Sequence, residues 1–229
     1  MTAEINQYPS RVSTGERLAT LAAVLAAAGS GPLLLVAAEA GYGSFHDWGL
    51  EVILPTVAGL ALLFVWAKGR RWSRLLSGLR ASFWIGILAT LGLDIVREFG
   101  FRLFHSMPGD ISMLMGVLLT DRFMEGPTWY SDALGELDHL WNGVTLAMVY
   151  LLLLGRQRVW MAVAYGLLVA VGFMTSSVVD AIGVGTFGKD FGPGFAVTVL
   201  LAHIVFGGLL GIGSRFASGI GKPLWERQQ

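Results

Sequence analysis

The chain has 229 residues, of which 54% are hydrophobic and 14% charged, whereas soluble domains carry about 25% charged residues. Its formal net charge is zero, so it lacks the basic surplus of a nucleic-acid-binding protein and no nucleic acid partner is expected. It has no cysteine, which excludes disulfides, thiolate metal sites and a cysteine nucleophile. With a mean hydropathy of +0.63, this composition predicts an integral membrane protein in contact with the lipid bilayer.

Apolar stretches of transmembrane length occur six times, because a helix needs about 20 apolar residues to cross the hydrocarbon core. The expected spans are Leu18–Ala40, Leu50–Ala67, Ala81–Phe104, Leu137–Leu154, Val159–Gly183 and Gly194–Phe216. The first is too long for a signal-peptide core, which predicts a retained helix. Gly29, Gly31 and Pro32 indicate a kink within it.

We therefore predict an all-α, polytopic helical bundle that forms one membrane domain over residues 1–229. It comprises an N-terminal two-helix hairpin over 18–67 and a four-helix core over 81–216. The loop 105–135 contains ISMLMGVLL, too short to span, which predicts an interfacial or re-entrant helix. That helix is either a lid or a plain surface helix. His139 and His203 each open a His-x-x-x-Gly segment, so spans three–four and five–six are interpreted as two copies of one hairpin.

The basic residues predict the orientation. Twelve of the 16 lie in segments that six spans place on one side: Arg11, Arg17, Lys68, Arg70, Arg71, Arg74, Arg80, Arg156, Arg158, Arg215, Lys222 and Arg227. The positive-inside rule assigns this side to the cytoplasm, so both termini are expected there, in a bacterial plasma membrane. All acidic residues except Glu4, Glu16 and Glu226, and all four histidines, then fall on the outer side.

Ionisable residues within the third span form the first half of a candidate site. Asp94, Glu98, Arg102 and His105 follow at spacings of four, four and three. At about 100° per residue, these spacings place them in one sector of a helix. Ionisable groups inside a span are costly, by about 3 kcal/mol each, and normally face the bundle interior.

The fourth and sixth spans complete the candidate site. Glu136 and His139 form a Glu-x-x-His pair, a spacing that lets a carboxylate and an imidazole reach one metal ion. Di-iron carboxylate bundles combine such pairs with carboxylates from neighbouring helices. We predict an outward-facing metal site whose ligands come from Asp94, Glu98, His105, Glu136, His139 and His203. Oxygen and nitrogen ligands favour Zn, Fe, Mn or Cu as Cu(II).

Other interpretations of these residues stay open. Asp94, Glu98 and Arg102 are (i, i+4) neighbours that can neutralise one another as a structural ion network, together with Arg97. A full di-metal set needs a second Glu-x-x-His pair, which the third span lacks. A proton or ion pathway is a further alternative, although the inner halves of the spans lack ionisable residues. His139 and His203 would suffice for one bis-histidine haem b, but no flanking pattern favours it.

Several segments after Phe83 carry a family resemblance. They are the Gly-rich WIGILATLGLD, the loop SMPGDISMLMG, the His-led DHLWNGVTLAMVY, the Trp-then-Tyr-Gly VWMAVAYGLL and the His-led LAHIVFGGLLG. In this layout, residues of about 83–216 resemble uncharacterised bacterial inner-membrane proteins of the YagU-like kind. The resemblance implies paired helical hairpins and no particular activity. The first two spans depart from the shorter family members.

The function predicted is that of an integral membrane protein whose outward-facing carboxylate and histidine cluster binds a divalent transition metal. One alternative is a structural or accessory membrane subunit, whose partner is another membrane protein or a second copy of the chain. The other is a proton- or ion-linked transporter. The sequence favours a non-enzymatic protein; an enzyme built on this cluster would be a metal-dependent membrane oxidoreductase or hydrolase.

Overall fold

The computed structural model describes residues 12–226, and these contain helices and turns but no strand. Glu4, Arg11 and Arg227, used above in the orientation argument, lie outside the described residues. The helical elements in chain order are α1 (Thr14–Ser30), α2 (Pro32–Glu39), α3 (Phe45–Trp48), the π-helical turn η1 (Gly49–Ile53), α4 (Leu54–Gly69), α5 (Ser73–Arg102), α6 (Ile111–Leu119), α7 (Trp129–Leu154), α8 (Val159–Met174), α9 (Ser177–Ala181), the 3-10 turn η2 (Thr186–Gly188) and α10 (Pro193–Phe216).

Five helical stretches of the described chain are long and apolar enough to cross a membrane. They are Thr14–Glu39, Phe45–Gly69, Ser73–Arg102, Trp129–Leu154 and Pro193–Phe216. The remaining expected span, the fifth (Val159–Gly183), corresponds to α8, an apolar helix of 16 residues, or about 24 Å at 1.5 Å per residue. The predicted all-α membrane class is therefore confirmed, with five helices of transmembrane length.

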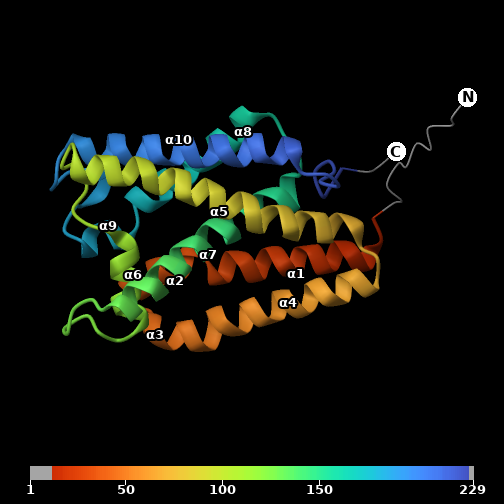
Figure 1. Cartoon of the computed structure of the whole chain (residues 1–229), viewed down its shortest axis with the longest axis horizontal. Coiled ribbons are helices and arrows are strands. Elements are labelled where there is room, and N and C mark those ends of the chain that lie inside the picture. Colours follow the sequence, from red (N-terminus) through yellow and green to blue (C-terminus); the bar gives the residue numbers. More distant parts are fainter. Residues whose placement is uncertain (1–11, 227–229) are drawn as a thin grey trace, which may run out of the picture.

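The long helices pack side by side along the length of the molecule (Figure 1). Helix α10 packs against both α5 and α8, α5 also packs against α7, and α1 packs against α7, while α4 contacts α1 and α5. Small residues allow the close approach of α8 and α10, since a Cβ added at Gly207 would lie 2.7 Å from the Cα atom of Val163. Helices α5, α7 and α10 thus form the centre of the bundle.

The predicted kink in the first span is confirmed. Helix α1 ends at Ser30 and α2 begins at Pro32, with Gly31 between them in a non-helical conformation. Proline cannot donate the backbone hydrogen bond that would continue α1, but it is well tolerated at the first position of a new helix. A Cβ at Gly31 would collide with the hydroxyl of Thr145 on α7, so the kink is also a close contact between helices.

Some helix ends differ from those expected, by eight or nine residues: α5 begins at Ser73 rather than Ala81, α7 begins at Trp129 rather than Leu137, and α8 ends at Met174 rather than Gly183. Hydropathy locates the apolar part of a helix, whereas hydrogen bonding sets its ends. A capping box of Thr128 and Ser131 starts α7 in a polar stretch. At the end of α8, the hydroxyl of Thr175 donates to the Val171 carbonyl at 2.9 Å.

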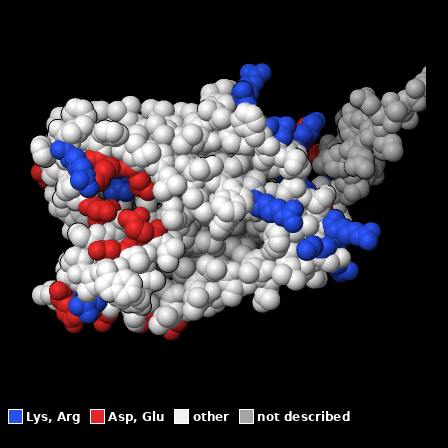
Figure 2. Space-filling model, in the orientation of Figure 1, with Lys and Arg blue, Asp and Glu red and all other residues white. Residues whose placement is uncertain are grey.

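Charged side chains gather at opposite ends of the bundle, and the face in Figure 2 shows a broad uncharged band between them. We call one end the basic end, formed by the start of α1, the end of α4, the start of α5 and the end of α10. The other, the acidic end, is formed by the end of α5, by α6 and by the start of α7. Helix α1 begins at the basic end, at Thr14, and α10 ends there, at Phe216 (Figure 1).

Candidate functional site

Helix α6 covers the acidic end and is held tightly against α7. A Cβ at Gly116 of α6 would run into the carbonyl oxygen of Ser131, and one at Gly135 of α7 would run into that of Ser112. Asp110 caps α6, because its Oδ1 accepts a hydrogen bond from the Ser112 amide at 3.0 Å. The short helix predicted in the loop 105–135 is therefore confirmed, and its action as a lid stays a prediction.

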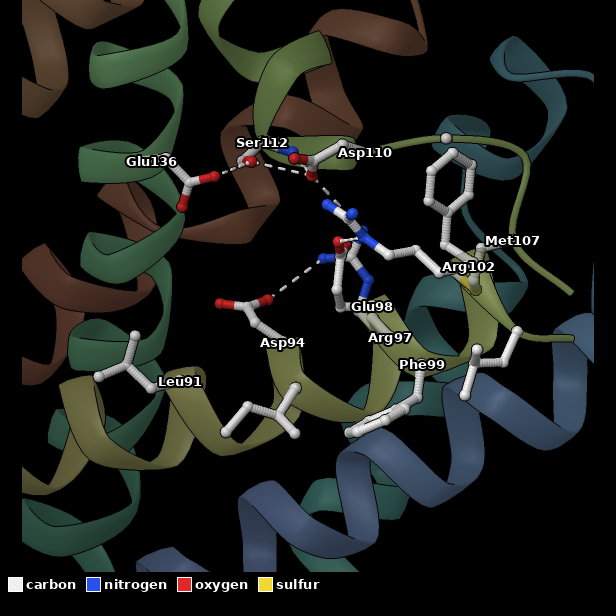
Figure 3. Close-up of a pocket in the computed structure, with 14 residues that line it drawn as sticks. Leu91, Asp94, Arg97, Glu98, Phe99, Arg102, Met107, Asp110, Ser112 and Glu136 are labelled. Carbon is white, nitrogen blue, oxygen red and sulfur yellow. Dashed lines mark hydrogen bonds and ion pairs between the residues drawn. The ribbon is translucent and has the colours of Figure 1, made fainter. Parts of the chain in front are cut away.

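A cavity of about 820 Å³ lies between α5, the start of α6 and α7, and we call it the acidic cavity (Figure 3). Its charged lining consists of Asp94, Arg97, Glu98, Arg102, Asp110 and Glu136. Its apolar lining includes Leu91, Ile95, Phe99, Phe101, Leu103 and Met107. The volume falls within the range of about 300–1,000 Å³ that is usual for sites of small organic ligands.

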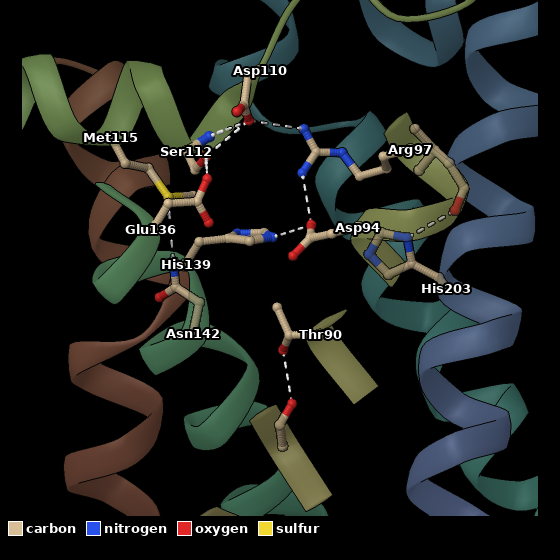
Figure 4. A network of polar contacts seen from close by, with 12 residues as sticks. Thr90, Asp94, Arg97, Asp110, Ser112, Met115, Glu136, His139, Asn142 and His203 are labelled. Carbon is tan, nitrogen blue, oxygen red and sulfur yellow. Dashed lines mark hydrogen bonds and ion pairs between the residues drawn. The ribbon is translucent and has the colours of Figure 1, made fainter. Parts of the chain in front are cut away.

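On one side of this cavity, charges from α5 and α7 neutralise one another (Figure 4). Asp94 Oδ1 lies 3.4 Å from Nη1 of Arg97 and 2.8 Å from Nε2 of His139. An ionised carboxylate only accepts hydrogen bonds, so Nε2 of His139 carries the proton and donates it. The side chains of Arg97 and His139 are only 12% and 13% exposed. This group is a buried ion network of the kind the sequence permitted.

On the other side, Ser112 links two carboxylates, those of Asp110 and Glu136. Its Oγ lies 2.9 Å from Oδ1 of Asp110 and 2.5 Å from Oε1 of Glu136. A hydroxyl has one proton, so Ser112 donates to only one of these carboxylates at a time. Nη2 of Arg97 lies 4.0 Å from Oδ1 of Asp110, and no basic side chain of the described residues has a nitrogen within 4.0 Å of the Glu136 carboxylate. This side of the cavity therefore has a surplus of negative charge.

The remaining charged pair of α5 lies at the mouth of the cavity. Glu98 accepts a hydrogen bond from Nε of Arg102, and both side chains are more than half exposed. His105 was expected to share the helical face of Asp94 and Glu98, and this expectation is wrong. Helix α5 ends at Arg102, and His105 lies beyond it, exposed, with a positive φ of 49°. The prediction assumed that the helix continues to His105, so the helical spacing does not place this residue on the same face as Asp94 and Glu98.

His203 lines a smaller cavity of about 110 Å³, which we call the inner chamber. Its Nδ1 lies 2.8 Å from the Val199 carbonyl, which can only accept, so Nδ1 donates. His139 and Arg97 also line the chamber, whose walls are otherwise mainly apolar. Arg97 thus lines both cavities.

The six predicted ligands do not converge on one point. Glu98 pairs with Arg102, Glu136 bonds Ser112, and the two imidazoles of His139 and His203 bond Asp94 and a backbone carbonyl. Within residues 12–226, no group of three or more His, Asp or Glu side chains is placed to hold a metal ion. The Glu-x-x-His spacing does direct both side chains to one side of α7, but toward different partners. The metal site stays a prediction of the sequence.

Sequence reasoning did not select Asp110, Ser112 and Asn142 as site residues. Asp110 and Ser112 reach the cavity only because α6 folds back onto α7. The available signal was Asp110-Ile-Ser112, since an aspartate followed by a serine before an apolar run is typical of a helix N-terminus. Asn142 follows His139 by three residues on α7, and its amide lies 3.4 Å from the buried carboxylate of Asp138.

The fold and this site define a helical membrane protein with an acid-lined cavity at one end of the bundle. No protein family, curated protein or solved structure matches the chain. The YagU-like resemblance therefore stays a prediction, and the function has to be argued from the cavity.

Proposed function

We propose that this chain is a six-span protein of a bacterial plasma membrane, with both termini in the cytoplasm. Helix α8 supports a crossing in addition to the five long helices. It begins next to Gly211 near the end of α10 and packs along α10, which returns the chain from the acidic end. An even number of crossings agrees with Thr14 and Phe216 lying at one end. The positive-inside rule places that basic end in the cytoplasm.

We propose further that the acidic cavity faces the non-cytoplasmic side and binds an organic cation. The observation that carries this proposal is the charge of its lining, where four carboxylates face two guanidiniums. Asp94 and Glu98 are matched by Arg97 and Arg102. Asp110 caps α6 and lies 4.0 Å from Arg97, which already pairs with Asp94, and Glu136 has no basic side chain within 4.0 Å among the described residues. An ammonium group would supply a positive charge together with hydrogen-bond donors to these carboxylates.

The size and the apolar lining of the cavity favour an organic ion over a bare metal. A transition metal is normally held by three or four convergent protein ligands, and among the described residues only two of the predicted ligands, Asp94 and His139, bond each other. A cavity of about 820 Å³ with Leu91, Ile95 and Phe99 in its wall offers contact area to the carbon atoms of a ligand.

The neutralised group of Asp94, Arg97 and His139 supports a structural role for that part of the cluster. Its charges are matched and two of its three side chains are nearly buried, as expected of an internal network that ties α5 to α7. The binding function is therefore assigned to Asp110, Ser112 and Glu136, and the structural function to the neighbouring network.

The experiment compares butylammonium with butanol, which has a similar carbon chain and no charge, by titration calorimetry on purified protein. Butylammonium is expected to bind and butanol is not. Glu136→Gln removes one negative charge at an exposed position and should weaken butylammonium binding about tenfold, or about 1.4 kcal/mol. Asp132→Asn is the matched control, since Asp132 is exposed one turn earlier on α7 and does not line the cavity.

Two results would overturn the proposal. The first is equal binding of butanol and butylammonium, which would show that charge does not contribute. The second is unchanged affinity in Glu136→Gln, because the surplus charge around Ser112 would then have no part in recognition.

A further inference from the structure

The acidic cavity extends from the end of α5 deep along that helix. Arg102 is the last residue of α5, and Leu91 lies eleven residues before it. At 1.5 Å per residue, the two are about 16 Å apart along the helix axis. If Arg102 lies at the membrane surface, Leu91 lies about halfway through a hydrocarbon core of about 30 Å. Leu91, Ile95 and Phe99, spaced by four residues, form an apolar wall along this length. Asp94, Glu98 and Arg102 form a charged row beside it at similar depths.

The cavity also opens to the side of the bundle. Figure 2 views the molecule perpendicular to its long axis, and the acidic side chains are visible around a hollow on that lateral face. Leu91, Ile95 and Phe99 are 47%, 59% and 56% exposed, and all three line the cavity. In a bilayer, side chains exposed at this depth face acyl chains, so the apolar part of the cavity is continuous with the lipid.

The charged part presents both signs. Glu136 and Asp110 form the side with surplus negative charge. Arg102 stands at the mouth with its side chain 74% exposed, and its Nε bonds Glu98. A guanidinium in this position is suited to a phosphate group, for which arginine provides paired donors. The lining therefore complements a zwitterion with an ammonium at one end and a phosphate at the other.

We propose that the occupant of the acidic cavity is an aminophospholipid of the non-cytoplasmic leaflet, which enters from the side. Its ammonium group lies against Glu136 and Asp110, its phosphate lies near Arg102, and an acyl chain runs along Ile95 and Leu91. This inference rests on the proposed cation-binding function and names the class of ligand. The complementarity of charge and the lateral apolar wall both favour a lipid over a soluble amine.

The test uses the full chain in nanodiscs made of equal parts phosphatidylethanolamine and phosphatidylglycerol. Lipid that stays bound after extraction is identified by mass spectrometry. The wild type is expected to retain phosphatidylethanolamine about tenfold over phosphatidylglycerol. Glu136→Gln should bring the ratio close to one, and Asp132→Asn should leave it unchanged.

A second variant tests the contact with the acyl chain. Ile95→Ser should reduce retention of phosphatidylethanolamine severalfold and weaken butylammonium binding much less, because an acyl chain offers Ile95 far more contact than a four-carbon amine does. Free phosphoethanolamine, which has the head group without the chains, should bind more weakly than the lipid by at least tenfold.

The outcomes separate this inference from the cation-binding function. Binding of butylammonium without preference for phosphatidylethanolamine would overturn the lipid assignment and leave the proposed function in place. Equal affinity for free phosphoethanolamine and for the lipid would overturn it as well, and would identify a soluble ligand. Failure of butylammonium, phosphoethanolamine and the lipid alike would overturn both.

Discussion

The two ends of the bundle use their charges differently. At the basic end, arginines bond backbone carbonyls at the ends of helices. Nη2 of Arg74 lies 3.2 Å from the Leu152 carbonyl in the last turn of α7, and Nη2 of Arg156 lies 2.6 Å from that of Ala217, just after α10. At the acidic end, side chains bond other side chains around a cavity. Asp94, Arg97 and His139 are one such group, and Asp110, Ser112 and Glu136 are another.

This difference shows which charges are available for recognition. The last carbonyls of a helix have no partner within it, so arginines at the basic end satisfy backbone groups that every helix leaves open. At the acidic end, Asp110 accepts a hydrogen bond from a backbone amide of α6, but the other carboxylates of the cavity bond side chains. The acidic end is the candidate site because its carboxylates line a cavity and, except for Asp110, are not needed to bond backbone groups.

The largest effect is expected from removing the buried cation of the acidic end. Arg97→Leu leaves Asp94 without its guanidinium and should lower the free energy of unfolding by about 3 kcal/mol, because breaking a buried ion pair leaves an uncompensated charge. Chemical unfolding in detergent measures this loss. Arg97→Lys keeps the positive charge and should lower the free energy of unfolding by less than Arg97→Leu does. Stability within 0.5 kcal/mol of the wild type would contradict the assignment of a structural network.

The next effect concerns the helix that covers the acidic end. Gly135→Ala places a Cβ against the backbone of α6 and should cost about 2 kcal/mol, with faster hydrogen exchange along Ile111–Leu119. Gly59→Ala on α4 is the control, since a Cβ there meets nothing within 4 Å. Unchanged exchange in α6 would mean that the close contact of the two helices does not hold it in place.

A smaller effect is expected at the basic end. Arg156→Gln removes charge-assisted bonds to the carbonyls of Ser214 and Ala217 and should lower the free energy of unfolding by about 1 kcal/mol. Its affinity for butylammonium should equal that of the wild type. A change in affinity of more than threefold would contradict the separation of structural and binding charges between the ends.

The smallest effect is expected from an exposed pair near the end of the described chain. Nζ of Lys222 lies 2.6 Å from Oε1 of Glu226, and the two side chains are 68% and 43% exposed. Glu226→Gln should change the free energy of unfolding by less than about 0.5 kcal/mol, as measured by the same unfolding experiment, because solvent screens such pairs. A larger loss would indicate that this pair has a structural role like that of Arg156.

Much of the fold could be predicted from local features of the sequence. The apolar stretches predicted the membrane class, Gly31 and Pro32 predicted the kink, and ISMLMGVLL predicted the short helix α6. Helix ends were harder to place, because hydropathy does not detect a cap such as Thr128 within a polar stretch. His105 was misassigned because the helical spacing used to place it continues past Arg102, the residue where α5 ends.

The candidate site could be predicted only in part. The sequence by itself determined that Asp94 and His139 lie within apolar helices, where a charge needs a partner, and the structure pairs them at 2.8 Å. Only the tertiary structure decided that Glu136 would meet Ser112, whose hydroxyl also lies close to Asp110. Periodicity defines which side chains share one face of one helix, but the fold of α6 onto α7 brings two distant segments together. The absence of a Cβ at Gly116 and Gly135 allows the backbones of α6 and α7 to approach each other this closely. The cavity beside them is lined by four carboxylates and two guanidiniums, so its lining has too little positive charge to balance them.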